Sequence, residues 1–309
     1  MVNITDGEIR LLMKKSLRLK GIFLVTFGTL LWGVSGTTAQ YLFQSENFTP
    51  EWLVTTRMLL SGAILLLIGI IKGDKNIFNI WKKKDDVIRL FLFALLGMLG
   101  VQYAYFAAIN HGNAATATIL QYLAPIIITF YICIRNRKLP TLKQILCVAM
   151  AMIGTFLILT KGNINSLSIS KEALFWGIIT AFASALYTLQ PVKLIKKYGS
   201  ICTVGWAMLI GGVAFCFVNS PFDCTGNWSF QSFLAVLFIM IFGTIIAFSA
   251  YMESLKYIEP YEASILGCIE PLSAAFLSIV FLHVTFNWIQ WFGTILIITT
   301  VSILSVIKK

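Results

Sequence analysis

Long runs of apolar residues, separated by short polar segments, follow one another along the whole chain. A helix that crosses a bilayer needs roughly 20 such residues, and ten runs meet this length. They lie near residues 21–43, 51–71, 88–110, 113–134, 141–160, 173–192, 200–218, 230–254, 260–282 and 287–307. The runs are continuous and lack the alternation of half-buried strands, and a helix satisfies its own backbone groups in lipid. The pattern predicts an all-α membrane protein with ten transmembrane helices.

Composition supports a chain that is mostly embedded in lipid. Apolar types make up 58% of the residues and charged types 12%, whereas a soluble domain carries about 25% charged residues. The first apolar run is too long for a signal-peptide core and lacks a clear cleavage site, so we expect it to be retained as a span. The connections are short, which leaves no room for a separate soluble domain.

The basic residues indicate how the chain is oriented. Of its 24 lysines and arginines, only Lys161 and Lys171 fall in predicted external loops, and Arg57 lies inside a span. All the others fall in segments on one side, and such a bias marks the cytoplasmic side. We therefore expect a multi-pass protein of the inner (cytoplasmic) membrane with both termini in the cytoplasm. The same bias accounts for the net charge of +11 without a nucleic-acid partner.

Cysteine and histidine usage gives no sign of a metal or disulfide framework. The six cysteines are scattered without a CxxC spacing, and His111 and His283 are far apart in the sequence. No glycine-rich phosphate loop is present, so we expect no ATP hydrolysis by this chain. We expect no cofactor and no bound metal.

A shared offset of 146 residues relates the two halves of the chain. Identical residues recur at this offset in the pairs Gly97/Gly243, Ala104/Ala250, Tyr105/Tyr251, Ala117/Ala263, Ile119/Ile265, Leu120/Leu266, Pro125/Pro271 and Gln144/Gln290. A repeat of five spans has an odd number of crossings, so the second half enters the membrane from the opposite side. Inverted repeats of this kind are typical of transporters. We predict a cytoplasmic tail over 1–20, a first five-helix repeat over 21–160 and a second over 161–309.

Several motifs in these repeats resemble one known family. They are Leu31-Trp32-Gly33, the stretch from Ala107 to Pro125 and the stretch from Tyr251 to Pro271, which ends in a Glu-Pro pair. The chain resembles the EamA family of the drug/metabolite transporter superfamily over essentially its whole length. The resemblance implies ten helices from a duplicated five-helix unit. It also implies transport of small metabolites such as amino acids or amines, often in the export direction.

The chain departs from this family at one pattern. A Gly-Glu pair commonly follows the fourth and ninth helices of the family, whereas this chain has Arg135-Asn136-Arg137 and Leu282-His283 there. No role of those acids is carried over to it.

Glu270 is the most informative candidate site residue. It lies about ten residues into its span, which at 1.5 Å per residue places it near the middle of the hydrocarbon core. A carboxylate at this depth is costly and commonly functional. We expect it to bind substrate and to couple transport to a proton or cation. The alternative is a protonated side chain that hydrogen-bonds between helices. Pro271 follows, and Pro125 is its counterpart in the first half, so both predict helix kinks near mid-membrane.

Other candidates are the buried cation and the polar aromatic and amide residues near mid-membrane. Arg57 could bind a substrate carboxylate, pair with an acid or extend to the interface. The aromatic and amide candidates are Trp32, Gln102, Tyr103, Tyr105, Gln121, Tyr122, Tyr187, Trp206 and Tyr251. If several converge, they would form an apolar pocket with polar handles or a cation–π cage; otherwise they pack between helices. Of these, Trp32, Tyr103, Gln121, Tyr122, Tyr187 and Trp206 join Arg57 and Glu270 as predicted substrate-binding residues. Three acids near helix ends, Glu253, Glu259 and Glu262, are expected to be solvated.

The leading hypothesis is a secondary active transporter that exports small metabolites by alternating access. A second is uptake of a cationic nutrient or efflux of lipophilic cations, which the aromatic residues and Glu270 would suit. A membrane-embedded enzyme would need clustered acids, histidines or cysteines at one interface, so we expect no enzyme; a sensor or scaffold without transport is a further class. The expected partners are a small-molecule substrate and the lipid bilayer, with protons as a candidate coupling ion and a second copy of the chain as a candidate partner.

Overall fold

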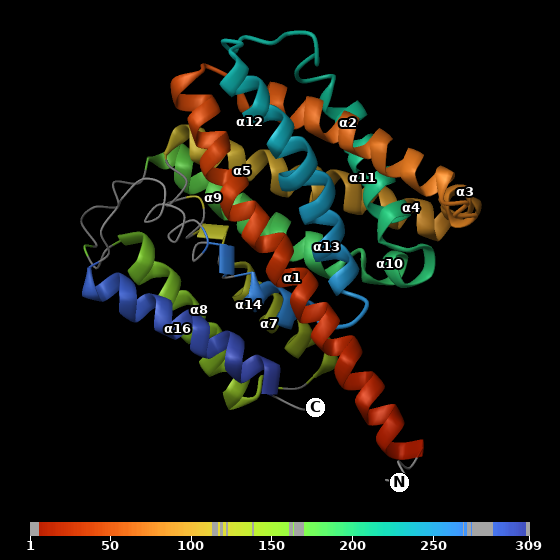
Figure 1. The fold of residues 1–309 in the computed structure, drawn as a ribbon, viewed down its shortest axis with the longest axis vertical. Coiled ribbons are helices and arrows are strands. Elements are labelled where there is room, and N and C mark those ends of the chain that lie inside the picture. Colours follow the sequence, from red (N-terminus) through yellow and green to blue (C-terminus); the bar gives the residue numbers. More distant parts are fainter. Residues whose placement is uncertain are drawn as a thin grey trace.

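A computed structural model describes residues 6–112, 117, 120–121, 123–137, 139–160, 163, 170–267, 269–270, 273 and 287–306. Every regular element in these residues is a helix (Figure 1), as the apolar pattern predicts. The helices are α1 (Asp6–Ser45), α2 (Pro50–Ile71), α3 (Asn76–Asn79), η1 (Ile80–Lys82), α4 (Lys84–Leu92), η2 (Phe93–Leu99), α5 (Gly100–His111), α7 (Ala124–Asn136), α8 (Leu142–Thr160), α9 (Lys171–Leu189), α10 (Val192–Tyr198), α11 (Ser200–Phe215), α12 (Phe230–Met240), η4 (Ile241–Ile246), α13 (Ala247–Ser254), α14 (Pro260–Leu266) and α16 (Trp288–Val306).

Five helical stretches in the described residues are long and apolar enough to cross a membrane. They are Lys15–Ser45, Pro50–Ile71, Lys84–His111, Lys171–Tyr198 and Phe230–Ser254. Two shorter apolar helical stretches, Ile145–Gly154 and Ser200–Phe215, lie within further predicted spans. Large apolar side chains are exposed along the outside of several helices, among them Phe23, Leu67, Leu96, Phe182 and Phe233. These side chains would face lipid, where their exposure carries no cost.

The first helix extends well beyond its predicted span. It begins at Asp6, within the segment that we predicted to be a tail, and its N-terminal turns reach past the other helices (Figure 1). Lysine, arginine and leucine are good helix formers, so the helix continues into the polar N-terminal segment. This extension brings an Arg18 guanidinium nitrogen within 3.2 Å of a Glu262 carboxylate oxygen. Glu262 is only 6% exposed, so the expectation that it is a solvated charge is wrong.

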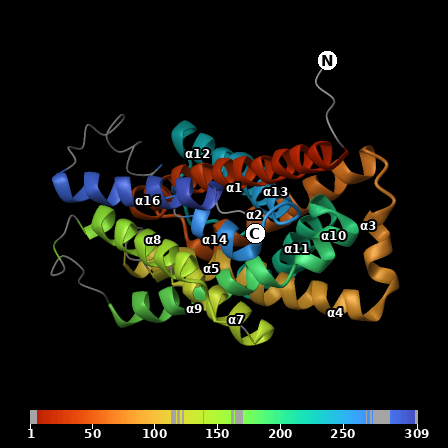
Figure 2. The ribbon, with the colours of Figure 1, turned by 90° about the horizontal axis from the view of Figure 1, so that it is seen from below.

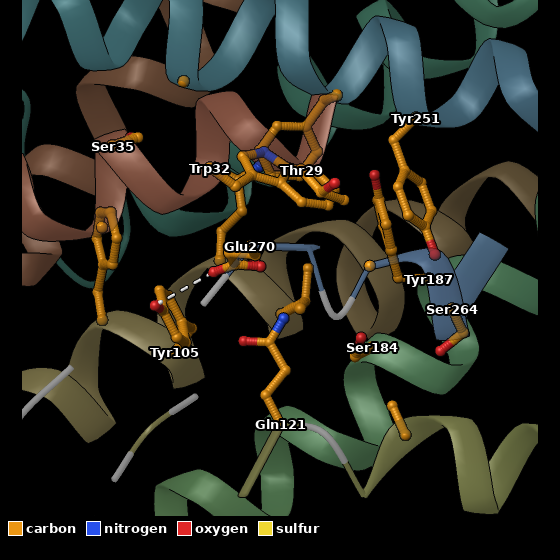
Figure 3. Close-up of a pocket in the computed structure, with 18 of the residues that line it drawn as sticks. Thr29, Trp32, Ser35, Tyr105, Gln121, Ser184, Tyr187, Tyr251, Ser264 and Glu270 are labelled. Carbon is orange, nitrogen blue, oxygen red and sulfur yellow. Dashed lines mark hydrogen bonds between the residues drawn. The ribbon is translucent and has the colours of Figure 1, made fainter. Parts of the chain in front are cut away.

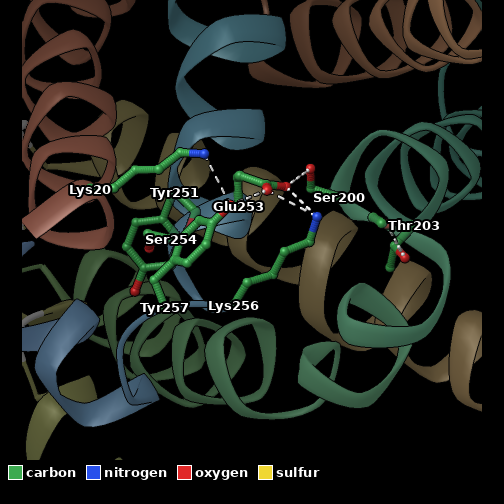
Figure 4. Close-up of polar contacts among 9 residues, drawn as sticks. Lys20, Ser200, Thr203, Tyr251, Glu253, Ser254, Lys256 and Tyr257 are labelled. Carbon is green, nitrogen blue, oxygen red and sulfur yellow. Dashed lines mark hydrogen bonds and ion pairs between the residues drawn. The ribbon is translucent and has the colours of Figure 1, made fainter. Parts of the chain in front are cut away.

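A second polar cluster lies where α1, α11 and α13 meet (Figure 4). Ser200 donates a hydrogen bond to Glu253, and the ammonium group of Lys256 lies 2.8 Å from Oε2 of the same carboxylate. Tyr257 also donates to Glu253, and its hydroxyl accepts a hydrogen bond from Lys20. Glu253 is therefore held by protein donors, and its side chain is 25% exposed, so the expected solvation is only partial. The cluster ties α1 to the turn that follows α13.

Long helices pack in pairs that each join one predicted half of the chain to the other. α2 runs along α11, α8 along α16, α5 along α9 and α1 along α13. The α2–α11 pair is close because both helices carry glycines at the contact. A methyl group built on Gly62 would lie 2.6 Å from the Leu209 nitrogen, and one on Gly212 would lie 2.9 Å from the Leu59 nitrogen. Figure 2 shows α1, α12 and α13 along one side of the molecule and α4, α5 and α9 along the other.

Two spans are α-helical at both ends and π-helical in the middle. One is α4–η2–α5, in which η2 covers Phe93–Leu99, and the other is α12–η4–α13, in which η4 covers Ile241–Ile246. The backbone stays helical through both segments, so each span is continuous. The end of each span that follows the π segment, α5 or α13, contributes to the cavity described next.

Candidate functional site

A cavity lies between α1 and α13 on one side and α5 and α9 on the other. Its empty volume is about 770 Å³, which includes the space at its mouth. Residues from α1, α2, α5, α7, α9, η4, α13 and α14 line it, together with Gln121 before α7 and with Gly267 and Glu270 after α14. Among the lining residues are Thr29, Trp32, Ser35, Gly36, Arg57, Gln102, Tyr105, Phe106, Gln121, Ala124, Ser184, Tyr187, Gly243, Phe248, Tyr251, Ser264, Gly267 and Glu270. The lining is mostly apolar with a few polar groups, which is the usual composition of a small-molecule site.

Glu270 lies at the wall of this cavity and is 7% exposed. The Tyr105 hydroxyl donates a hydrogen bond of 3.5 Å to its Oε1 (Figure 3). The three ion pairs among the described residues do not include Glu270. A buried carboxyl without a cation beside it is costly when it is charged. Glu270 is therefore suited to hold a proton or a positively charged group of a ligand.

The backbone around Glu270 departs from a regular helix. α14 ends at Leu266, and the Gly267 carbonyl accepts a hydrogen bond of 2.9 Å from the Glu270 nitrogen, three residues ahead. Pro271, one of the two predicted kinks, lies outside the described residues. Its counterpart Pro125 lies in the first turn of α7, where proline is tolerated because the first amides of a helix have no partner within it.

Arg57 lines the same cavity from α2 and is 4% exposed. Its guanidinium carbon lies 4.0 Å from the centre of the Phe106 ring, a cation–π contact. Nη2 donates a hydrogen bond of 3.5 Å to the Gln102 carbonyl oxygen. The side chain is thus buried against α5.

An aromatic cluster forms one wall of the cavity (Figure 3). The Trp32 ring lies 4.8 Å from Phe248, 5.0 Å from Tyr251 and 6.2 Å from Tyr187, measured between ring centres. The Tyr251 hydroxyl lies 3.1 Å from the Thr188 Oγ1, so these two groups share a hydrogen bond. Figure 3 shows Trp32, Glu270 and Gln121 directed into the same space. Ring faces beside a carboxyl are a favourable surround for a cation.

Several polar atoms at the cavity are buried and have no hydrogen-bond partner among the described residues. They are Trp32 Nε1, Arg57 Nε, both side-chain atoms of the Gln102 amide, Gln121 Oε1 and the Tyr187 hydroxyl. A buried polar group without a partner costs about 1–3 kcal/mol, and native proteins contain few of them. Six such atoms lie around one cavity, so hydrogen-bonding capacity for a polar ligand or water is concentrated there.

Of the eight predicted substrate-binding residues, five line the cavity: Trp32, Arg57, Gln121, Tyr187 and Glu270. Two others, Tyr103 and Trp206, do not line it. The eighth, Tyr122, lies outside the described residues.

Tyr103 and Trp206 have partners elsewhere. The Tyr103 hydroxyl donates to Glu51 at 2.9 Å, and Trp206 Nε1 donates to the Ile77 carbonyl at 2.8 Å. The Trp206 ring packs against Trp81, with 4.9 Å between ring centres. Neither residue is among those that line the cavity.

Sequence reasoning missed the small and hydroxyl-bearing residues of the lining. Thr29, Ser35 and Gly36 lie three or four residues from Trp32, on the same face of α1. Helical spacing from an already chosen residue was the signal that would have found them. Ser184, three residues before Tyr187, follows the same rule on α9.

Comparisons with known proteins agree with this architecture. The model of the EamA-like transporter family matches residues 19–160 and 171–306. The uncharacterized inner membrane transporter YicL of Salmonella typhimurium is 39% identical over 290 residues, which cover 93% of this chain and 95% of that protein. The uncharacterized transporter YyaM of Bacillus subtilis is 22% identical over 244 residues, 75% of this chain and 76% of that protein. A solved crystal structure superimposes with a TM-score of 0.72 at 16% identity and covers 94% of this chain and 96% of its own. The chain belongs to the EamA-like transporter family and is a membrane transporter.

Proposed function

We propose that this protein is a secondary carrier for a small metabolite that bears both an amine and a carboxylate. The supporting observation is the cavity that Glu270 and Arg57 line together without forming an ion pair with each other. The carboxyl is the natural partner of an ammonium group. The guanidinium, whose Nε is unpartnered, is the natural partner of a carboxylate. A dipolar ligand would balance both buried charges at once, whereas an anion or a cation alone would balance one.

The architecture that we propose for transport is ten helices in two inverted five-helix repeats, with both termini in the cytoplasm. Its support is the pairing of helices across the two halves and the 146-residue offset, which also relates cavity residues: Gln102 to Phe248, Tyr105 to Tyr251, Gln121 to Gly267 and Ala124 to Glu270. A cavity lined by matching positions of two inverted halves is suited to alternating access. Export is the proposed direction, on family resemblance.

Flux into proteoliposomes tests this function. Purified protein would be reconstituted and the proteoliposomes loaded with substrates of one charge class at a time: a mixture of neutral L-amino acids, choline as a cation or lactate as an anion. We expect counterflow of radiolabelled neutral amino acids and little flux of lactate. Flux of lactate alone, or flux in none of the three classes, would refute the proposal.

Coupling to protons at Glu270 is a further part of the proposal. Replacing Glu270 with Gln keeps the shape of the side chain and removes its charge, so we expect transport to lose its dependence on pH. The exposed acid Glu172, at the start of α9, provides a matched control, because Glu172→Gln makes the same chemical change outside the cavity. A Glu270→Gln variant with the flux and pH profile of the unmodified protein would contradict the assignment.

A second candidate function is transport of an organic cation. The aromatic cluster of Trp32, Tyr187, Tyr251 and Phe248 beside Glu270 favours it, because quaternary ammonium groups bind between ring faces. In the same assay, choline flux above amino-acid flux, lost in Trp32→Ala, would select this function.

A further inference from the structure

The two π-helical segments occupy matching places in the two halves. Moved forward by the 146-residue offset, residues 95–99 of η2 fall on residues 241–245 of η4. π-helical turns are rare in proteins, and they are frequently found at functional sites. Their presence at the same position of both halves therefore points to a shared role.

Each π segment packs against a cavity residue of the opposite half through a glycine. A methyl group built on Gly97 of η2 would lie 3.2 Å from the Tyr187 Cα. One built on Gly243 of η4 would lie 2.2 Å from the Ser35 Oγ. Ser35 and Tyr187 both line the cavity. The segments thus touch the site from both halves: Gly97 lies against the backbone of Tyr187, and Gly243 lies against the side chain of Ser35.

Hydrogen bonds around η4 are adapted to its wider turn. The Thr244 hydroxyl donates to the Ile239 carbonyl, five residues earlier, at 2.7 Å. The Ser61 hydroxyl of α2 donates to the Met240 carbonyl at 3.4 Å, so a helix of the first half holds the start of a segment in the second. Both hydroxyl-bearing residues are fully buried.

The carbonyl at the matching position of the first half has a different neighbour. Ala94 lies 146 residues before Met240, and its carbonyl oxygen lies 3.2 Å from a methyl group built on Gly211 of α11. Gly211 has no side-chain donor, so it cannot supply the hydrogen bond that Ser61 supplies at η4. The two segments are alike in position and differ in how they are held.

A π segment is a place at which a helix can change its conformation. It contains one residue more than an α-helix of the same number of turns. Transfer of that extra residue along the helix rotates the turns that it passes by about 100°, the angle per residue of an α-helix. The parts beyond η2 and η4 carry Gln102 and Tyr105, and Phe248 and Tyr251, into the cavity.

We propose that η2 and η4 are paired hinges at which α5 and α13 move during transport, and that Ser61 is the positioning residue that holds η4 in the conformation described here. The proposal rests on the proposed carrier function for its role in transport. The hinges themselves can be tested without any substrate.

Hydrogen–deuterium exchange of the reconstituted protein is the first test. In Ser61→Ala we expect amides of 241–246 to exchange about threefold faster, in keeping with the loss of one weak hydrogen bond, and amides of 93–99 to remain unchanged. Ser61→Thr keeps the hydroxyl and should exchange as the unmodified protein does. Equal exchange in Ser61→Ala and the unmodified protein, or a change of the same size in both segments, would overturn the role of Ser61.

Deletion of Leu96 is the second test. This side chain faces outward from η2, and removal of one residue converts the segment to regular α-helix. We expect slower exchange over the shortened segment and at least a tenfold loss of neutral amino-acid counterflow, with Leu96→Ala near normal. Slower exchange with normal counterflow would overturn the proposal that η2 is a hinge. If the deletion variant does not fold, the exchange measurements on the Ser61 variants decide. Absence of counterflow in the unmodified protein would count against the carrier function alone, because exchange still reports on the hinges.

Discussion

Replacing Arg57 with Met should make the protein more stable and inactive. Arg57 is buried, makes one hydrogen bond of 3.5 Å and leaves Nε without a partner among the described residues. Removing an unpartnered buried donor is worth about 1–3 kcal/mol. The lost cation–π contact with Phe106 costs about 0.5–2 kcal/mol. Methionine is flexible and fills the same space, so the expected result is a net gain of about 1 kcal/mol.

The assay for this prediction combines stability and flux. Thermal unfolding in detergent should show a higher midpoint for Arg57→Met than for the unmodified protein, while counterflow of neutral amino acids should fall at least tenfold. Arg57→Lys provides the control: it keeps the positive charge and loses the planar fork, so flux should fall less. A destabilised Arg57→Met variant, or one with normal flux, would refute the argument that Arg57 is kept for a ligand at a cost in stability.

Three further changes probe the packing around the site. Gly243→Ala places a methyl group 2.2 Å from the Ser35 Oγ; it should cost about 1–3 kcal/mol and lower flux, as thermal unfolding and counterflow would show. Trp32→Ala opens the aromatic cluster and should weaken tetramethylammonium binding about tenfold in titration calorimetry; unchanged affinity would place the cation elsewhere. Glu262→Gln removes the partner of Arg18, which is partly exposed, so the loss of stability should be about 1 kcal/mol. The difference in stability between Glu262→Gln and the unmodified protein should shrink in high salt. A difference that does not depend on salt would contradict a charge-based contact.

The five long spans of the described residues were predictable because the bilayer imposes a length and a composition on each helix. The stretch 230–254 was predicted with the bounds that the structure has. The end of α1 was not, since hydropathy falls where the helix leaves the membrane although its residues still favour a helix. The pairing of Arg18 with Glu262 depends on that extension, and a contact across 244 positions leaves no local pattern.

Predicted depth in the membrane identified the kinds of residue that form the site, but it could not identify which face of each helix points into the cavity. Tyr103 and Tyr105 lie two positions apart on α5, about 200° around the helix. Tyr105 lines the cavity, whereas Tyr103 contacts Glu51 on the other side. Trp206 was equally deep by prediction, yet it docks the α3 segment. The π segments have no sequence pattern of their own, because they differ from α-helix only in which backbone groups bond.

The match between Ala124 and Glu270 has an evolutionary consequence. Both line the cavity, and they lie 146 residues apart, at corresponding places of the proposed repeats. Two copies of one duplicated unit start identical, so a shared ancestor had either two acids facing this space or none. A pair of acids would repel each other and favour a doubly positive ligand, and a site without acids would lack a charged partner for an amine. On the proposed duplication, Glu270, the single carboxyl among the described residues of the lining, marks a difference that arose after the two halves separated, and it would give a dipolar ligand one preferred orientation in the cavity.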